Sequence, residues 1–528
     1  MANAKITNTP FPAVADQRGQ NSLSRKTKAS RYFKRNLHRW HRILGLITVI
    51  PVIFWTVSGL MHPFMSHWFK PALPREFMTA RPLVREQIGL SPVAVLTQNG
   101  IGQFKNFRFV HLNQATYYQV RDTADYLQYF HAQTGQPLAN GDAFYAETLA
   151  RYVIADSLSP IRSVSRITHF TQEYKYVNRL LPVWKVSFNR PDGMDVYIET
   201  EQSRLATFNT HSRKTFLWIF DTFHNWSFLE RISTNGIRIT VMPIILSIII
   251  FSAVSGLVIY GLFWKRFKHP TRNNHTDPVR KYHRQIGLAV SLVTFTFAFS
   301  GAWHATRKYT PDDRNKFVYE PVFKTTEIAD VPLPEANWAR LLNIQLVRMG
   351  RENYFQLFYD KTDLEPSEVT YQHVATNAVL KDGNIRYAQY IANKFANLTG
   401  TQGNFQSACC DVMSDVANAA ISNDNLAEAK MMYRFDREYG FVNKRLPVVR
   451  LAYHTPAQTT YYIEPATSRL AAKIENADRA EGWSFAILHK YLLLEWAGKN
   501  IRDAVTLLAA AGVLTVSLFG LALFIKRP

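Results

Sequence analysis

HRILGLITVIPVIFWTVSGLMH, residues 41–62, is the stretch that decides the predicted fold. Residues 43–61 contain no Lys, Arg, Asp or Glu, and an imidazole stands at either end, at His41 and His62. A helix rises about 1.5 Å per residue, so the two histidines lie roughly 31 Å apart, close to the thickness of a bilayer's hydrocarbon core. The stretch therefore predicts a membrane-crossing helix with a histidine at each boundary.

Three further segments are uncharged and long enough to cross a membrane, namely 239–264, 285–303 and 504–525. A helix satisfies its own backbone polar groups, which is why apolar segments of this length cross a bilayer as helices. The sequence predicts four transmembrane helices.

The net charge of +22 is concentrated beside these segments. Residues 1–42 hold ten Lys and Arg but one acidic residue, and residues 265–284 hold seven Lys and Arg and one acidic residue. Basic residues gather on the cytoplasmic side of membrane helices. We expect both termini and the 265–284 loop to be cytoplasmic and the long loops to lie outside. The charge is explained by topology, so nucleic acid is not an expected partner.

The first apolar segment begins some 40 residues into the chain and is followed by no small-residue cleavage pattern, which favours an uncleaved anchor. The two cysteines, Cys409 and Cys410, are adjacent. They form neither a disulfide framework nor a CxxC metal motif, and the chain has no CxxCH motif for attaching a c-type haem.

Two halves of the sequence match each other. HRILGLITVIPVIFWTVSGLMH aligns with HRQIGLAVSLVTFTFAFSGAWH at an offset of 242 residues. At an offset of 265, EYKYVNRLLPVWKV aligns with EYGFVNKRLPVVRL and HNWSFLE with HKYLLLE. The change of offset predicts an insertion in the second external loop, at about 400–428. We interpret the pattern as a tandem duplication of helix, external domain and helix.

The predicted fold class is an α-helical membrane protein, with four transmembrane helices in a pseudo-two-fold tandem repeat and two large α+β periplasmic domains. Alternating runs such as DVYIET and TTYYIE predict strands, and DAFYAETLARYVI and IRYAQYIANKFANL predict helices. The predicted parts are a basic tail (1–36), helix (37–64), domain A (65–236), helix (237–264), cytoplasmic loop (265–281), helix (282–305), domain B (306–499), and a last helix with the cytoplasmic end (500–528).

Six histidines match across the two halves, and all are expected near a membrane boundary. They are His41, His62, His224, His283, His304 and His489. Ionisable residues at membrane depth are functional candidates, and imidazole is an axial ligand of haem iron. The alternatives are histidines that only pack at the boundary, or a zinc or copper site. The second is less favoured because no carboxylate or thiolate occurs at matched spacing.

Arg42 and Arg284 directly follow the first histidine of each matched helix. An arginine here would suit a haem propionate, because guanidinium pairs well with carboxylate. The alternative is that these arginines only enforce topology.

The motifs HRxxG…SGxxH, EYx(Y/F)VNxxLPV and YIExxxSRL, together with helices closing on SGL or FGL, resemble those of PepSY-domain transmembrane proteins. That group includes haem-containing siderophore and ferric reductases of the Gram-negative inner membrane. The resemblance covers the chain from about residue 36. It implies external PepSY modules, two or three b-type haems held by the six histidines, and electron delivery to periplasmic ferric iron or ferric siderophore. The insertion and the Cys409–Cys410 pair are departures from the family.

The matched positions suggest that His41 and His283 share one haem near the cytoplasm. On the external side, His62 could pair with His304, or each of these could pair with His224 or His489. The chain has no GxGxxG motif after a strand, so the electron donor is expected to be membrane quinol or a separate reductase. We expect a haem-based electron carrier in the membrane lipid, leaning towards a ferric (siderophore) reductase. The alternatives are an iron, siderophore or haem permease, and a regulator that binds peptide or protein through the PepSY modules.

Overall fold

The computed structural model describes residues 17–76, 78–268, 277–307, 317–328, 333–361, 368–400 and 425–526. The chain divides into two compact units. The helical unit comprises Met1–Pro63, Phe220–Tyr309 and Ser484–Pro528, and the sheet unit comprises Phe64–Ile219 and Thr310–Trp483. Helices α4 (His211–Phe223) and α10 (Asn476–Ser484) cross from one unit to the other along the chain.

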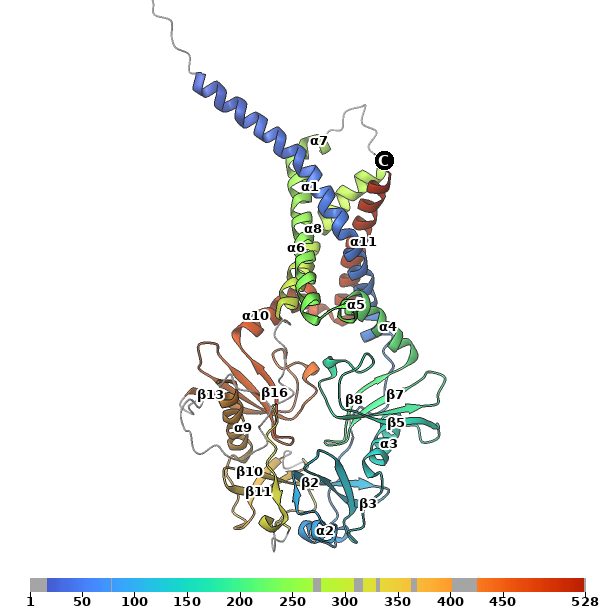
Figure 1. Cartoon of the computed structure of the whole chain (residues 1–528), viewed down its shortest axis with the longest axis vertical. Helices are drawn as coiled ribbons and strands as arrows, with labels where there is room; N and C mark the ends of the chain where they lie inside the picture. The colour runs from blue at the N-terminus through green and yellow to red at the C-terminus, as the bar shows by residue number, and fades with distance from the viewer. Residues whose placement is uncertain are drawn as a thin grey trace, which may run out of the picture. The chain divides into compact units, whose positions relative to one another are not determined.

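The helical unit contains four long apolar helices (Figure 1). Its helices are α1 (Gln17–Pro63), α5 (Ser227–Ile232), α6 (Asn235–Leu262), α7 (Trp264–Lys268), α8 (Pro278–Arg307) and α11 (Lys499–Ile525), with the short turns η8 (Phe485–His489) and η9 (Leu492–Ala497). Helix α1 packs against α6 and α11, and α8 packs against the same two helices, so the four form a closed ring.

The long helices expose apolar side chains on their outer faces. Phe251 is 66% exposed, Leu292 70% and Leu508 74%, whereas Val52 and Ile249 lie in the core between the helices. Large apolar surfaces of this kind are unfavourable in water and favourable in lipid. Spans Tyr32–Trp68, Gly236–Leu262, Pro278–Arg307 and Lys499–Ile525 are long and apolar enough to cross a membrane. The chain is a membrane protein.

The sheet unit has two halves. The first contains η1 (Phe64–Trp68), η2 (Arg85–Gln87), α2 (Pro92–Gln98), β1 (Gln103–Phe104), β2 (Asn106–Leu112), β3 (Ala115–Arg121), β4 (Leu127–His131), α3 (Gly141–Ile154), β5 (Ile161–Ile167), η3 (Tyr176–Asn178), β6 (Val183–Phe188), β7 (Asp195–Glu199) and β8 (Arg204–Asn209). The second contains β9 (Phe323–Lys324), η5 (Thr325–Ile328), β10 (Leu341–Met349), β11 (Glu352–Tyr359), β12 (Glu368–His373), α9 (Gly383–Gly400), β13 (Leu426–Met432), η7 (Phe441–Asn443), β14 (Val448–Tyr453), β15 (Thr460–Glu464) and β16 (Arg469–Ile474).

Each half holds a three-stranded and a four-stranded antiparallel sheet, in the orders β2-β3-β4 and β5-β6-β7-β8, then β10-β11-β12 and β13-β14-β15-β16. Helix α3 packs on the first four-stranded sheet and α9 on the second. Strands β7 and β15 are buried on both faces. The β-branched and aromatic residues of their YIE-type segments favour strands of this kind.

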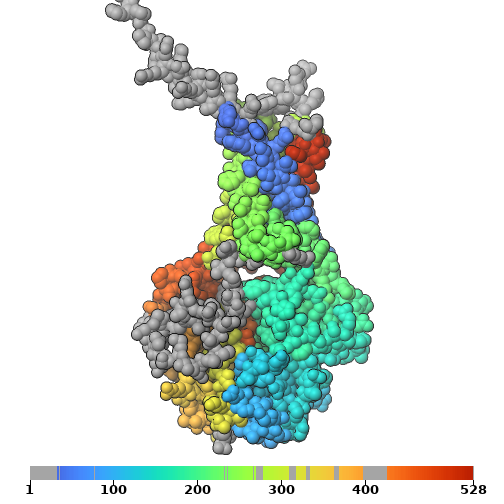
Figure 2. Space-filling view, in the orientation of Figure 1, coloured from blue at the N-terminus to red at the C-terminus, as the bar shows by residue number. Residues whose placement is uncertain are grey.

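The two halves of the sheet unit are joined directly. Strand β1 pairs with β9, in register Gln103↔Lys324. Strands β2 and β10 also touch, and Figure 2 shows this part of the first half, in blue, beside the yellow part of the second. There the Asn343 side chain accepts a hydrogen bond from the amide of Phe109 (2.9 Å) and donates one to its carbonyl (2.9 Å). The sheet unit therefore behaves as one body with a shared core.

The predicted fold class, an α-helical membrane protein organised as a tandem repeat, is wrong. Helix accounts for 49% of the structure and strand for 22%, in five antiparallel sheets, so the chain is mixed α/β. The apolar segments dominated the prediction because their signal is strong, but each is short compared with the loops. Alternating segments in those loops form most of the sheet structure.

Candidate functional site

The first pair of histidines lies between α1 and α8. The ring centroids of His41 and His283 are 6.4 Å apart, with 58° between the ring planes. Nδ1 of His41 lies 3.1 Å from the carbonyl oxygen of Ser252 and 2.9 Å from the hydroxyl of Ser255, which itself donates to that carbonyl. Nδ1 of His283 lies 3.0 Å from the carbonyl oxygen of Val516. A carbonyl oxygen only accepts hydrogen bonds, so both Nδ1 atoms carry the proton. In both rings Nε2 is left with its lone pair.

Two glycines make room for these rings. A Cβ atom built on Gly256 of α6 would lie 3.2 Å from Cε1 of His41, and one on Gly520 of α11 would lie 3.3 Å from Cε1 of His283. These are closer than ordinary side-chain contacts. The glycines of the SGL and FGL sequences therefore let each imidazole pack against a neighbouring helix backbone.

The second pair is formed by His224 and His489, whose ring centroids are also 6.4 Å apart, at 87°. Nδ1 of His224 lies 3.2 Å from the Ser58 hydroxyl, and Nδ1 of His489 lies 3.2 Å from the Ser300 hydroxyl. Both serines are buried.

The serine hydroxyls in turn donate along their own helices. Ser58 donates to the carbonyl of Phe54 (2.6 Å), and Ser300 to that of Thr296 (2.7 Å). Since each hydroxyl proton is already used, the serine oxygen accepts from the imidazole. This arrangement again favours the tautomer with the proton on Nδ1.

The remaining two histidines pack against phenylalanines. The ring centroids of His62 and Phe220 are 5.6 Å apart at 51°, and those of His304 and Phe485 are 4.5 Å apart at 27°. The same two phenylalanine rings stack on the second pair, Phe220 on His224 at 4.4 Å and Phe485 on His489 at 4.6 Å. His62 and His304 thus flank the second pair.

The two predicted arginines lie over aromatic rings at the His41 end. Cζ of Arg42 is 5.4 Å from the ring centroid of Phe524, and Cζ of Arg284 is 4.4 Å from that of Phe267. Each arginine directly follows a histidine of the first pair in the sequence. Each is held by a cation–π contact. On α1, a Cβ added at Gly45 or Gly59 would meet nothing within 4 Å, so the backbone there is open to a bulky neighbour.

The geometry of both pairs fits one metal ion between two imidazoles. Two imidazoles that bind one ion from opposite sides, each at roughly 2 Å, place their ring centroids about 6 Å apart. Among the described residues, no group of three or more His, Cys, Asp and Glu side chains could hold a metal ion alone. The donor sets are thus pairs, which suits an iron whose other ligands come from a macrocycle and does not suit tetrahedral zinc.

Sequence reasoning predicted the association of His41 with His283, but it did not consider His224 with His489. Aligning the two halves of the sequence identifies equivalent residues, but it does not show which side chains of one half contact those of the other. The available signal was that Ser58 matches Ser300 and that each histidine of the pair follows a phenylalanine by four residues, at Phe220 and Phe485. Cys409, Cys410 and most of the predicted insertion lie outside the described residues.

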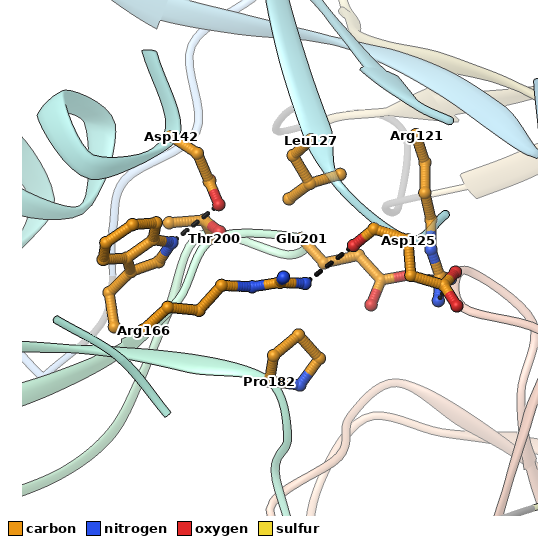
Figure 3. A pocket seen from close by; sticks show the side chains of 9 residues that line it. Arg121, Asp125, Leu127, Asp142, Arg166, Pro182, Thr200 and Glu201 are labelled. Carbon is orange, nitrogen blue, oxygen red and sulfur yellow. Dashed lines mark hydrogen bonds and ion pairs between the residues drawn. The ribbon is translucent and has the colours of Figure 1, made fainter. Parts of the chain in front are cut away.

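The sheet unit contains a small pocket of about 20 Å³ between β3, β5 and β6 (Figure 3). Its polar groups are already bonded. Trp184 donates to Asp142 (2.6 Å), and Arg166 donates to the carbonyl of Asp125 (2.7 Å). The space holds about one water molecule. This pocket is structural and too small for a substrate.

Two comparisons bear on identity. No curated protein sequence gives a significant match. The family model of the PepSY-associated TM region matches residues 123–527, which is most of the chain and includes four of the six histidines. The chain therefore belongs to the family of PepSY-associated transmembrane proteins.

Proposed function

We propose that this protein carries electrons across a membrane through haems held by paired histidines, and delivers them to ferric iron or a ferric siderophore. The observation that supports this most is the state of the four paired imidazoles. In each pair both Nδ1 atoms lie 3.0–3.2 Å from an oxygen of a neighbouring helix, and the two ring centroids are 6.4 Å apart, the spacing of two imidazoles on one ion. Boundary histidines that only pack would not need this arrangement in both pairs.

The chain's own residues would bind the haem iron, orient the imidazole rings and keep water away from the haem. The oxygens that accept hydrogen bonds from Nδ1 would fix the orientation of each ring and raise the basicity of Nε2. The apolar helices exclude water, which limits the reactions open to a bound redox group. Haem, when bound, would supply reversible one-electron chemistry.

The two pairs would form two sites near opposite membrane boundaries. His41 and Ser58, which holds His224, are 17 positions apart on α1, or roughly 25 Å. We assign the His41 end to the cytoplasmic side of a bacterial inner membrane and the sheet unit to the periplasm, on the charge pattern. The donor would be quinol or a separate reductase.

The deciding experiment is the dithionite-reduced minus oxidised absorbance spectrum of the purified full chain, with pyridine-haemochrome quantitation. A b-type α-band with two haems per chain is expected, followed by reoxidation on adding a ferric chelate. Folded protein from haem-replete cells that shows no haem bands would overturn the proposal. A chain that binds haem but is not reoxidised by any ferric chelate would overturn the choice of acceptor.

A further inference from the structure

The sheet unit contains a cluster of cations around one buried aromatic ring, Phe208 of β8. Cζ of Arg213 lies 4.8 Å from the centroid of this ring, and Nζ of Lys70 lies 5.9 Å from it. Phe208 is 3% exposed. Two cations from different segments therefore share one ring.

A third cation reaches the cluster from the second half of the sheet unit. Nζ of Lys444, just after η7, donates to the carbonyl of Ala206 (3.1 Å), two residues before Phe208. Burial, followed by the nearby charges of Arg213 and Lys70, lowers the pKa of Lys444, with Glu76 acting in the opposite direction. Like charges have thus been brought together, which costs free energy in the absence of an anion.

The guanidinium of Arg213 is the least compensated member. Its Nε and Nη1 atoms are enclosed and have no hydrogen-bond partner among the described residues. Burial lowers the pKa of Arg213, and no described carboxylate counteracts it. The acidic residue at the cluster, Glu76, is half exposed and lies 3.6 Å from Lys70. Buried donors without acceptors are rare and indicate a missing partner.

We propose that Arg213, Lys444 and Lys70 bind an oxygen-rich anion, and that this anion is a negatively charged ferric chelate of the carboxylate class. The planar fork of Arg213 suits a carboxylate, and the two lysines add charge without directional demands. The choice of a ferric chelate rests on the proposed function. It selects anionic chelates over neutral hydroxamate complexes as substrates.

The test is isothermal titration of the full chain, in nanodiscs of zwitterionic lipid, with gallium(III) citrate, a redox-inert stand-in for the ferric complex. We expect binding that weakens with salt, and a neutral gallium trihydroxamate that binds at least tenfold more weakly. Arg213→Gln and Lys444→Gln should each weaken citrate binding about tenfold or more, because each removes a charge-assisted hydrogen bond. Lys324→Gln, an exposed lysine on β9, is the matched control and should bind as the parent does.

Folding is checked independently by the melting temperature and the haem content of each variant. Absence of citrate binding, or equal binding by Arg213→Gln and the parent, would overturn the proposal. Dependence of the melting temperature on anionic lipid that is lost in Arg213→Gln, without chelate binding, would overturn it in favour of a lipid phosphate. Chelate binding by a chain without haem would leave this site standing and refute the proposed function instead.

Discussion

Each histidine of the two pairs is fixed through one ring nitrogen, and the acceptors differ in kind. Nδ1 of His283 contacts a backbone carbonyl, and those of His224 and His489 contact serine hydroxyls that donate to their own helices. Nδ1 of His41 contacts both kinds of group, the Ser252 carbonyl and the Ser255 hydroxyl. A hydroxyl is a more removable partner than a carbonyl, since a substitution deletes it. Substituting Ser58 or Ser300 therefore perturbs the second pair without changing a histidine.

Replacing one ligand should remove the haem that its partner shares. His41→Ala and His283→Ala should each lose the same one of two haems, because a single imidazole holds a b-type haem weakly. His224→Ala and His489→Ala should lose the other. Haem per chain and the shape of the split α-band measure this. His38→Ala is the control, since the His38 ring packs against Phe263, with the ring centroids 5.0 Å apart, and belongs to neither pair. Different spectral losses within one pair would contradict the pairing.

Gly256 offers a test that leaves every ligand in place. A Cβ there would lie 3.2 Å from Cε1 of His41, so Gly256→Val should displace the ring and lower occupancy of the first site several-fold. The absorbance bands of that site report the change. Gly261→Val on the same helix is the control, because a Cβ at Gly261 would meet nothing within 4 Å. Equal effects of the two substitutions would show general damage to α6 and exclude a contact with His41.

The limits of the sequence as a predictor are visible in these residues. His41 and His283 stand at the same end of the two matched apolar stretches, so their proximity could be foreseen. His224 and His489 lie in short segments where the chain returns from the sheet unit to the helical unit. Whether their rings come together depends on how those segments turn. Chain spacing does not encode such turns, and the serines that hold the rings looked like ordinary small helix residues.

Among the secondary-structure elements, the strongest patterns predicted type and place correctly. DAFYAETLARYVI lies in α3, IRYAQYIANKFANL in α9, DVYIE forms β7 and TYYIE forms β15. The first membrane helix was predicted over 37–64, but α1 begins at Gln17. The basic segment before the apolar stretch contains no proline from residue 17 onward, so no residue stops the helix at the edge of the apolar stretch.

The turn between β7 and β8 should make the sheet unit acid-sensitive. Burial alone would raise the pKa of Glu201, but Arg469 and Arg121 outweigh it and lower the pKa to about 2. A carboxyl with a depressed pKa stabilises the fold above its unfolded pKa, about 4.3, and this stabilisation is lost as pH falls towards 2. The melting temperature should fall across that window. Glu201→Gln should melt lower at neutral pH and show a flatter pH dependence.

Exposed Glu335→Gln should keep the parent's pH dependence, which makes it the control for this titration. If the melting temperature of Glu201→Gln fell with pH in parallel with that of the parent, protonation of Glu201 would not contribute to the acid sensitivity. The readout is calorimetry of the full chain between pH 5 and pH 2.

At the scale of the whole molecule, buried charges join the two halves of the sheet unit. Glu464 of the second half forms an ion pair with Arg204 of the first (2.8 Å) and accepts a hydrogen bond from Arg445 (2.7 Å). Glu199 also pairs with Arg204. Hydrophobic segments could be recognised from the sequence as strands, but this network could not. These charged residues lie at strand ends and in a loop. Which of them become neighbours is determined only when the two halves pack together.

Glu464→Gln should therefore destabilise the sheet unit as a whole. Glu464 is 1% exposed, and removing one partner from a buried ion pair costs about 3–5 kcal/mol because the opposite charges remain buried. Near-UV circular dichroism of the sheet unit's tyrosines should show a lowered unfolding midpoint, with the haem bands of the helical unit unchanged below it. Glu428→Gln is the matched control: its exposed carboxylate pairs with Lys430 at 2.7 Å and with Arg450, and exposed pairs contribute less than about 1 kcal/mol each. If the two variants melted alike, the two halves would be held together by their shared apolar core, and the buried network would be neutral to stability.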